Sequence, residues 1–181
     1  MLHFVSTREE ARELARRHER FWVSNCGCRE GRDGCGRSRI DLCLYFHDAG
    51  SGTGTGFHEV TEAFVEGIFR EAAEQRLVAR PFRVADGSPI VGGICFCCDD
   101  CCGYFLDPQE ACAKGTQVAR TDMESCTDCL ACVPACYFHA RRAEGDELIL
   151  HDESCYGCGL CAEVCPTECI QMVPRPILQT A

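Results

Sequence analysis

The sequence predicts an α+β protein in two parts: a cysteine-rich, mainly helical N-terminal module over residues 1–116 and a C-terminal domain over residues 117–181. The C-terminal prediction depends on a set of four cysteines that returns 29 positions later, with strand-like segments after each copy. The N-terminal prediction depends on two amphipathic segments with helical spacing. A length of 181 residues with 46% hydrophobic content fits one or two small globular domains.

Three elements are expected in the N-terminal module. Thr7-Arg-Glu-Glu10 has the form of a capping box and apolar residues follow it at helical spacing, which predicts a helix over about residues 7–22. The short apolar run 40–46 favours a buried strand. A second amphipathic helix is expected from about His58 to Leu77, with apolar side chains on one face.

Connectors and short strands complete the expected elements. The stretch 50–56 has glycine at every second position and lacks a following Gly-Lys-Ser/Thr, so it favours a flexible connector over a nucleotide-binding loop. Residues 107–116 are expected to form a short helical linker. Beyond it, each half of the cysteine repeat predicts a loop, a short helix and a strand. The strands are expected at 148–150 and 170–173.

The repeated cysteines carry the strongest chemical signal. The pattern Cys-x2-Cys-x2-Cys-x3-Cys occurs twice. Three thiolates at this spacing can hold one face of an iron–sulfur cube, while the fourth reaches a neighbouring cube. Zinc sites rarely need such a duplicated arrangement, although zinc and disulfides remain alternatives. We therefore expect two [4Fe–4S] clusters. The cysteines concerned are Cys126, Cys129, Cys132 and Cys136 in the first copy, and Cys155, Cys158, Cys161 and Cys165 in the second.

About the last 60 residues resemble the bacterial-type dicluster ferredoxins, which have a pseudo-twofold α+β fold. The resemblance implies that the fourth cysteine of each motif binds the other cluster. One cluster would then have the ligands Cys126, Cys129, Cys132 and Cys165, and the other Cys155, Cys158, Cys161 and Cys136. The sequence departs from the family at Tyr137, where a proline is usual, and at Cys169, where a small residue is usual. We interpret Cys169 as a buried free thiol.

Nine further cysteines predict a third metal site in the N-terminal module. So many thiols would be an oxidation hazard unless they were ligands. An iron–sulfur centre is favoured over zinc because the same cell must already load clusters into this chain. A redox-active or simply buried thiol cluster is the alternative. The favoured ligands are Cys26, Cys28, Cys35 and Cys43, with Cys95, Cys97, Cys98, Cys101 and Cys102 as a second set or as their partners.

The order of these N-terminal cysteines is also similar to a module that precedes dicluster ferredoxin domains in uncharacterised proteins of anaerobic bacteria. This resemblance covers nearly the whole chain. It implies iron–sulfur binding without a defined reaction. The Cys-Cys-Gly at 101–103 is only a weak match to heterodisulfide-reductase-type subunits, because the repeated frame of those proteins is missing.

Net charge and composition indicate which kinds of partner the protein can have. The net charge is −10, and from Val118 onward ten acidic residues face four arginines. This acidity disfavours nucleic acid and favours a redox partner with a basic docking surface. An odd cysteine count without a signal peptide predicts a cytoplasmic, reducing and oxygen-poor setting. No apolar run approaches the ~20 residues of a membrane span.

Three functions are compatible with these observations. The favoured one is single-electron transfer to or from a partner oxidoreductase, as a carrier or a subunit. The second is a redox enzyme or activator with an open coordination site on an N-terminal cluster. The third is an iron–sulfur sensor, against which the net acidity argues because a sensor of this kind needs a basic surface for nucleic acid. No residue pattern indicates a catalytic triad or a pair of catalytic carboxylates.

Overall fold

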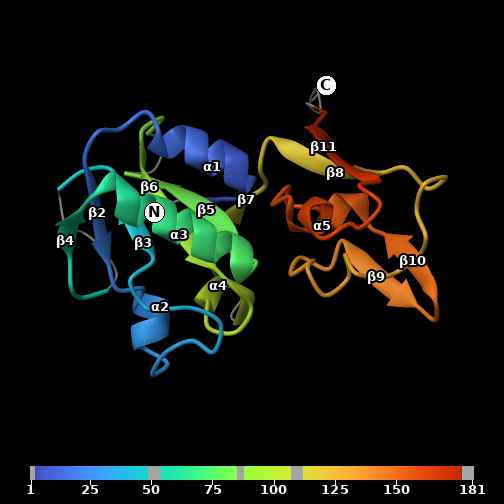
Figure 1. The fold of residues 1–181 in the computed structure, drawn as a ribbon, viewed down its shortest axis with the longest axis horizontal. Coiled ribbons are helices and arrows are strands. Elements are labelled where there is room, and N and C mark those ends of the chain that lie inside the picture. Colours follow the sequence, from blue (N-terminus) through green and yellow to red (C-terminus); the bar gives the residue numbers. More distant parts are fainter. Residues whose placement is uncertain (1–2, 49–53, 85–87, 107–111, 177–181) are drawn as a thin grey trace.

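A computed structural model of the protein describes residues 3–48, 54–84, 88–106 and 112–176 (Figure 1). The connector expected at 50–56 lies largely outside the described residues, as does the first half of the expected linker. The second half of that linker is not helical, because Cys112–Ala113 form strand β7 in parallel pairing with β1, His3–Phe4. The described residues contain no helix that is both long and apolar enough to cross a membrane.

The N-terminal module is built on a seven-stranded sheet, which corrects the expected mainly helical character. The strand order is β4-β2-β3-β6-β5-β1-β7, and all neighbours except β1 and β7 are antiparallel. The strand expected at 40–46 is present as β3. The bounds of the remaining strands are Phe21–Ser24 for β2, Cys43–Tyr45 for β3, His58–Val60 for β4, Val78–Arg83 for β5 and Val91–Cys97 for β6.

Both expected helices are present but shorter than predicted. Helix α1 spans Arg8–Ala15 and begins with the predicted capping box at Thr7. The prediction that it reaches residue 22 is wrong, because the aromatic and β-branched segment Phe21–Ser24 pairs as a strand. Helix α3 spans Glu62–Glu74 after the cap at Thr61, and the residues just before it form β4.

The two helices cover one face of the sheet (Figure 1), and Cys43 and Cys95 pack in a separate cluster with Trp22 and Phe82. Ile68 and Phe69 of α3 pack in the same core as Leu44 and Phe96, with 5.3 Å between the ring centroids of Phe69 and Phe96. Because side chains alternate along a strand, the residues next to Leu44 and Phe96 point away from the helices. Those residues include Cys43, Cys95 and Cys97.

The C-terminal part consists of two antiparallel strand pairs around short helical turns. The strands expected at 148–150 and 170–173 are confirmed within β10 and β11. β8 pairs antiparallel with β11, and β9 pairs antiparallel with β10. The bounds are Gln117–Thr121 for β8, Arg141–Glu144 for β9, Glu147–Leu150 for β10 and Ile170–Pro174 for β11, with the 3-10 turn η1 at Asp152–Ser154 and helix α5 at Leu160–Glu163.

The backbone of the two cysteine loops repeats as the sequence does. Three residues in the first half of the repeat have a left-handed backbone, and each has a left-handed counterpart one repeat length further along the chain. At Gly157 a Cβ atom would come within 2.2 Å of the Gln117 carbonyl oxygen, so glycine is required there. The pairs are Asp128 with Gly157, Leu130 with Gly159, and His139 with Glu168.

The two parts of the chain are packed together. The Gly115 amide donates to the carbonyl of Tyr156 at 2.9 Å. The Arg37 guanidinium donates to the Tyr137 hydroxyl at 2.8 Å, and this hydroxyl donates to the carbonyl of Arg76 at 3.1 Å. Ala135, Tyr137 and Leu160 belong to the same hydrophobic core as the helices and sheet.

Candidate metal centres

One pocket of the C-terminal part is lined by cysteines from both halves of the repeat. It lies between the first cysteine loop and the residues just before β11. Cys129 is exposed at this pocket, whereas Cys132 is buried. Cys169 is a buried thiol, as expected, and its Sγ lies 3.4 Å from that of Cys165. The repeat cysteines that line the pocket are Cys126, Cys129, Cys132 and Cys165.

A second pocket has the complementary set of thiols. Burial raises the pKa of the Cys158 thiol well above its usual value and that of Cys161 to about 11. Phe138 and Tyr156 form part of its wall. The cysteines that line it are Cys136, Cys155, Cys158 and Cys161. Each pocket therefore combines three thiols from one half of the repeat with one from the other half.

The spacing of these eight thiols fits a polynuclear centre better than a single ion. Among the described residues, no three of these eight sulfurs lie within 4.8 Å of one another. A four-iron cube places its four thiolate ligands further apart than one ion does, and thiolates are the ligands that such cubes take. Since burial keeps several of these thiols protonated, binding of a cluster must release protons.

Arg141 lies between the two pockets and was not singled out by sequence reasoning. Its side chain is 4% exposed, and Nη1 donates to the Thr121 hydroxyl at 2.9 Å. Burial lowers the pKa of the guanidinium, but the neighbouring thiols of Cys161 and Cys132 raise it, and the net effect is an increase. One buried positive charge therefore contacts a thiol of each pocket.

Of the nine N-terminal cysteines expected as metal ligands, six form a continuous set of thiol contacts, which we call the six-thiol chain. Contact with Cys102 lowers the pKa of Cys28, whereas contact with Cys28 raises the pKa of Cys102. His3 Nε2 lies 3.6 Å from the Cys95 sulfur at one end of the chain. The contacts run in the order Cys95, Cys43, Cys26, Cys28, Cys102 and Cys97.

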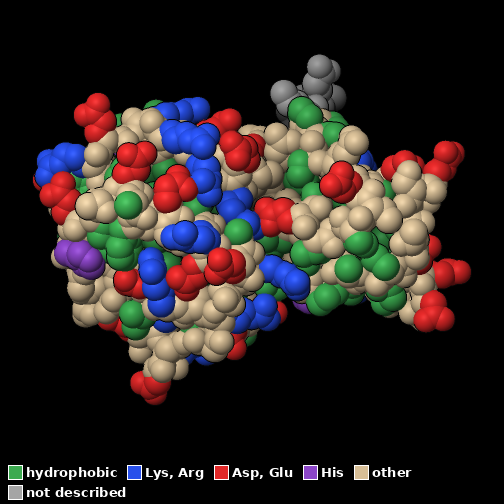
Figure 2. Space-filling view, viewed as in Figure 1, with side chains coloured by type: hydrophobic (Ala, Val, Ile, Leu, Met, Phe, Trp, Pro, Cys, Tyr) green, Lys and Arg blue, Asp and Glu red, His purple; other side chains and the backbone are tan. Residues whose placement is uncertain are grey.

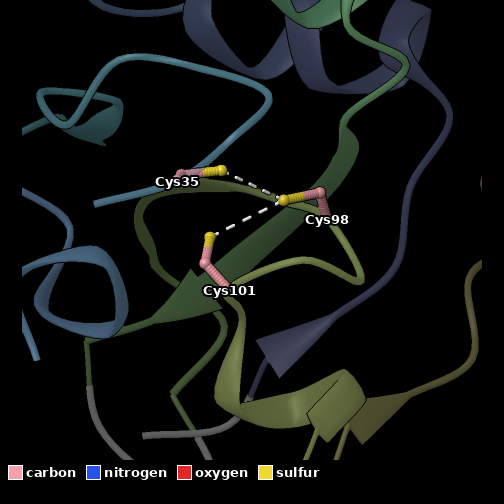
Figure 3. A group of neighbouring side chains, drawn as sticks. All are labelled: Cys35, Cys98 and Cys101. Atoms are coloured by element: carbon pink, nitrogen blue, oxygen red, sulfur yellow. Dashed lines mark hydrogen bonds between the residues drawn. The ribbon is translucent and has the colours of Figure 1, made fainter. Parts of the chain in front are cut away.

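The other three cysteines, Cys35, Cys98 and Cys101, form a separate group, which we call the three-thiol group (Figure 3). The three sulfurs lie within 4.8 Å of one another. The structure thus separates Cys35 from the other members of the favoured set, Cys26, Cys28 and Cys43. The turn after β6 causes this separation, because it brings Cys98 and Cys101 to the loop that carries Cys35.

Two buried arginines accompany the N-terminal thiols, and both are 1% exposed. Arg80 Nη1 lies 3.4 Å from the sulfur of Cys102 and 3.7 Å from that of Cys97. Arg29 lies between the two groups, where its Nη2 donates to the Phe96 carbonyl at 3.1 Å. Arg29 could have been found from the sequence, because it directly follows the expected ligand Cys28. Arg80, in an apolar strand, has no comparable signal.

Aromatic side chains connect the second pocket with the six-thiol chain. Phe138 and Tyr156, from the wall of the pocket, stack with 4.4 Å between ring centroids. Tyr104, at α4 (Gly103–Leu106), lies 6.2 Å from Phe138 and 6.4 Å from Tyr156 by the same measure. The Arg80 guanidinium is 4.2 Å from the Tyr104 ring. Aromatic side chains therefore link the two parts of the protein.

Comparison with known proteins places the C-terminal part in a recognised class. The family described as "4Fe-4S binding domain" matches residues 148–171. A curated relative, "Pyruvate synthase subunit PorD" of Thermotoga maritima, is 42% identical over 53 residues, which are 29% of this chain and 54% of the relative. The chain thus spans about half the length of that relative. No solved structure matches.

These matches, together with the pockets, define a 4Fe–4S ferredoxin-type domain in an α+β protein. The domain holds at least one [4Fe–4S] cluster and supports iron–sulfur electron transfer. The matched segment contains the second cysteine motif, Cys155 to Cys165, and parts of the two strands that flank it. Because the family match begins at residue 148, it does not extend to the cysteine-rich N-terminal module.

Proposed function

We propose that this chain is an electron-transfer protein with two [4Fe–4S] clusters in the domain 117–181, joined to an N-terminal module, 1–116, that carries a further metal site. The observation that carries the proposal is the composition of the two pockets, each with three thiols from one motif and a fourth from the other. The matching left-handed positions and the pairing of β8 with β11 support a pseudo-twofold repeat around the two clusters.

The two clusters have different surroundings, which suggests that electrons are exchanged with an external partner at only one of them. The first cluster has the ligands Cys126, Cys129, Cys132 and Cys165, and because Cys129 is exposed it is the one that meets an external partner. Figure 2 shows acidic side chains at the end of the molecule that carries β9 and β10. This surface suits a partner oxidoreductase with a basic docking face. The relative is named as a subunit of pyruvate synthase, so an oxidoreductase of that kind is a candidate partner.

The second cluster, at Cys136, Cys155, Cys158 and Cys161, exchanges electrons with the first cluster and with the N-terminal module. Phe138 and Tyr156 lie at its wall and contact Tyr104, which adjoins the six-thiol chain. The Nη1 atom of the buried Arg80 lies 3.7 Å from the sulfur of Cys97 and 3.4 Å from that of Cys102. A redox centre in the six-thiol chain would therefore be an internal partner of the ferredoxin-type domain.

Replacing Arg141 by glutamine should lower the reduction potentials of both clusters. The guanidinium contacts one ligand thiol of each cluster, so its charge favours the added electron on either side. We expect a decrease of about 59 mV or more, the equivalent of a tenfold change in a one-electron equilibrium. EPR-monitored redox titration measures it. Arg142→Gln, an exposed neighbour, is the matched control. Equal shifts in reduction potential in the two variants would show that the buried charge of Arg141 has no specific effect on the clusters.

The proposal is tested by metal analysis of the full chain. Protein reconstituted without oxygen should contain at least about eight irons and eight sulfides. After reduction, EPR should show two low-potential clusters whose spins interact. The rate of electron exchange with a basic haem protein, used as a probe, should fall as salt is added. An iron content near four per chain would reject the paired-cluster proposal.

A further inference from the structure

The three-thiol group has a geometry unlike that of the cluster pockets. The sulfur of Cys98 lies 3.5 Å from that of Cys35 and 3.6 Å from that of Cys101. A tetrahedral zinc ion with Zn–S bonds of about 2.3 Å separates its sulfurs by about 3.8 Å. Among the described residues this is the one group of three metal-binding side chains that meets such spacing. The distances therefore match one ion.

The local sequence also fits a single-ion site. Cys98 and Cys101 have the Cys-x2-Cys spacing of a zinc knuckle, which is easily overlooked inside the dense run of cysteines after β6. Both are buried, at 0% and 2% exposure, while Cys35 is half-buried on the loop after α2, Gly27–Glu30. An ion at the three sulfurs would have an inner side closed by protein and an outer side near solvent.

Arg29 gives independent evidence for negative charge at this place. Its side chain is buried, and its Nε and Nη1 atoms lack a hydrogen-bond partner. It interacts with the thiol of Cys26 in the six-thiol chain and with those of Cys101 and Cys35 in the three-thiol group. An isolated guanidinium in a protein interior is costly unless an anion compensates it. Three thiolates around a divalent ion carry one net negative charge, which Arg29 would neutralise.

We propose that Cys35, Cys98 and Cys101 bind one thiophilic divalent ion of the zinc class, with Arg29 as the balancing charge and an external ligand at the fourth position. Binding replaces the three thiol protons, which are released to solvent. This site is separate from both ferredoxin clusters and does not depend on them. In that case, the iron–sulfur centre that the sequence predicts for this module would be bound by the six-thiol chain alone.

The site would also stabilise the contact between the two parts of the protein. Arg37, two residues after Cys35, forms an ion pair with Asp99 at 2.7 Å between Nη2 and Oδ1. The same guanidinium donates to the hydroxyl of Tyr137, the neighbour of cluster ligand Cys136. An ion that fixes Cys35 and Cys98 therefore holds in place the segments that carry Arg37 and its partner Asp99.

The test is zinc analysis and zinc K-edge X-ray absorption on the full chain, purified with zinc present and with its iron clusters intact. We expect about one zinc per chain, with about three sulfur neighbours near 2.3 Å and one lighter atom. Cys35→Ser, which changes the most accessible ligand, should remove most of this zinc and leave iron and sulfide unchanged. Cys112→Ser, which changes a cysteine that is not part of the three-thiol group, should retain it.

Two results would overturn the proposal. One is a full chain that takes up no zinc while its iron and sulfide are complete. The other is a Cys35→Ser protein that loses about four irons and four sulfides, which would make the group part of a cluster. Because iron and sulfide are counted separately from zinc, failure of this site and failure of the two ferredoxin clusters are distinguishable. Arg29→Met should weaken zinc binding and serves as a second variant should Cys35→Ser fold poorly.

Discussion

Changing Cys136 to alanine is expected to abolish the cluster whose other ligands come from the second motif, and to spare the cluster nearest to it in sequence. The reason is the composition of the pockets: Cys136 lies with Cys155, Cys158 and Cys161, not with the three cysteines that precede it. Three thiolates leave one iron of the cube without a protein ligand. The iron content should fall from about eight to about four per chain.

Alkylation under anaerobic conditions, followed by mass spectrometry, shows which cluster is lost. In the Cys136→Ala protein the thiols of Cys155, Cys158 and Cys161 should become reactive, while Cys126 and Cys132 remain protected. Cys169→Ala is the matched control, since this thiol lies 3.4 Å from Cys165 and is not assigned as a ligand. Protection of the second motif with exposure of the first would contradict the exchange of fourth ligands.

The grouping of the C-terminal cysteines could be predicted because its information is local. Three proposed ligands of each cluster lie within seven residues, and their spacing alone predicts a cube. The strands at Leu148 and Ile170 were equally clear, as short apolar runs next to the cysteine loops. Arg141 could not be predicted in the same way. Nothing in a single arginine of a short strand shows that its guanidinium enters the space between two pockets.

The N-terminal module was predicted less well because its structure depends on distant contacts. Two helices were expected and are present, but most of the sheet is formed by short strands that pair across long stretches of sequence. The division of the thiols has the same origin. Cys35 meets Cys98 across 63 residues, so no local spacing could separate it from Cys26 and Cys28. Gly93 in β6 shows how closely these distant strands approach one another, because a Cβ atom there would lie 2.1 Å from the Leu44 carbonyl oxygen.

Removing the iron should unfold the ferredoxin-type domain and leave the seven-stranded sheet folded. Three of the six buried residues in the core of that domain are cysteines, namely Cys132, Cys161 and Cys169. Under the proposed function, the clusters bound by such cysteines would take the place of a hydrophobic core. Metal–thiolate binding is worth on the order of 10 kcal/mol in small metal domains, comparable to the whole stability of a typical domain. The sheet instead has a large apolar core that includes Leu44, Ile68 and Phe96.

Hydrogen exchange detected by mass spectrometry measures this difference. After treatment with an iron chelator in the presence of a thiol reductant, amides of β8 to β11 should exchange nearly as fast as in an unfolded chain. Those of β5 and β6, the most extensively paired strands of the sheet, should keep their protection. If strands β8 to β11 remain protected from exchange without iron, the apolar residues of this small domain are sufficient to keep it folded. The clusters would then bind to a preformed fold, and folding would not be coupled to their assembly.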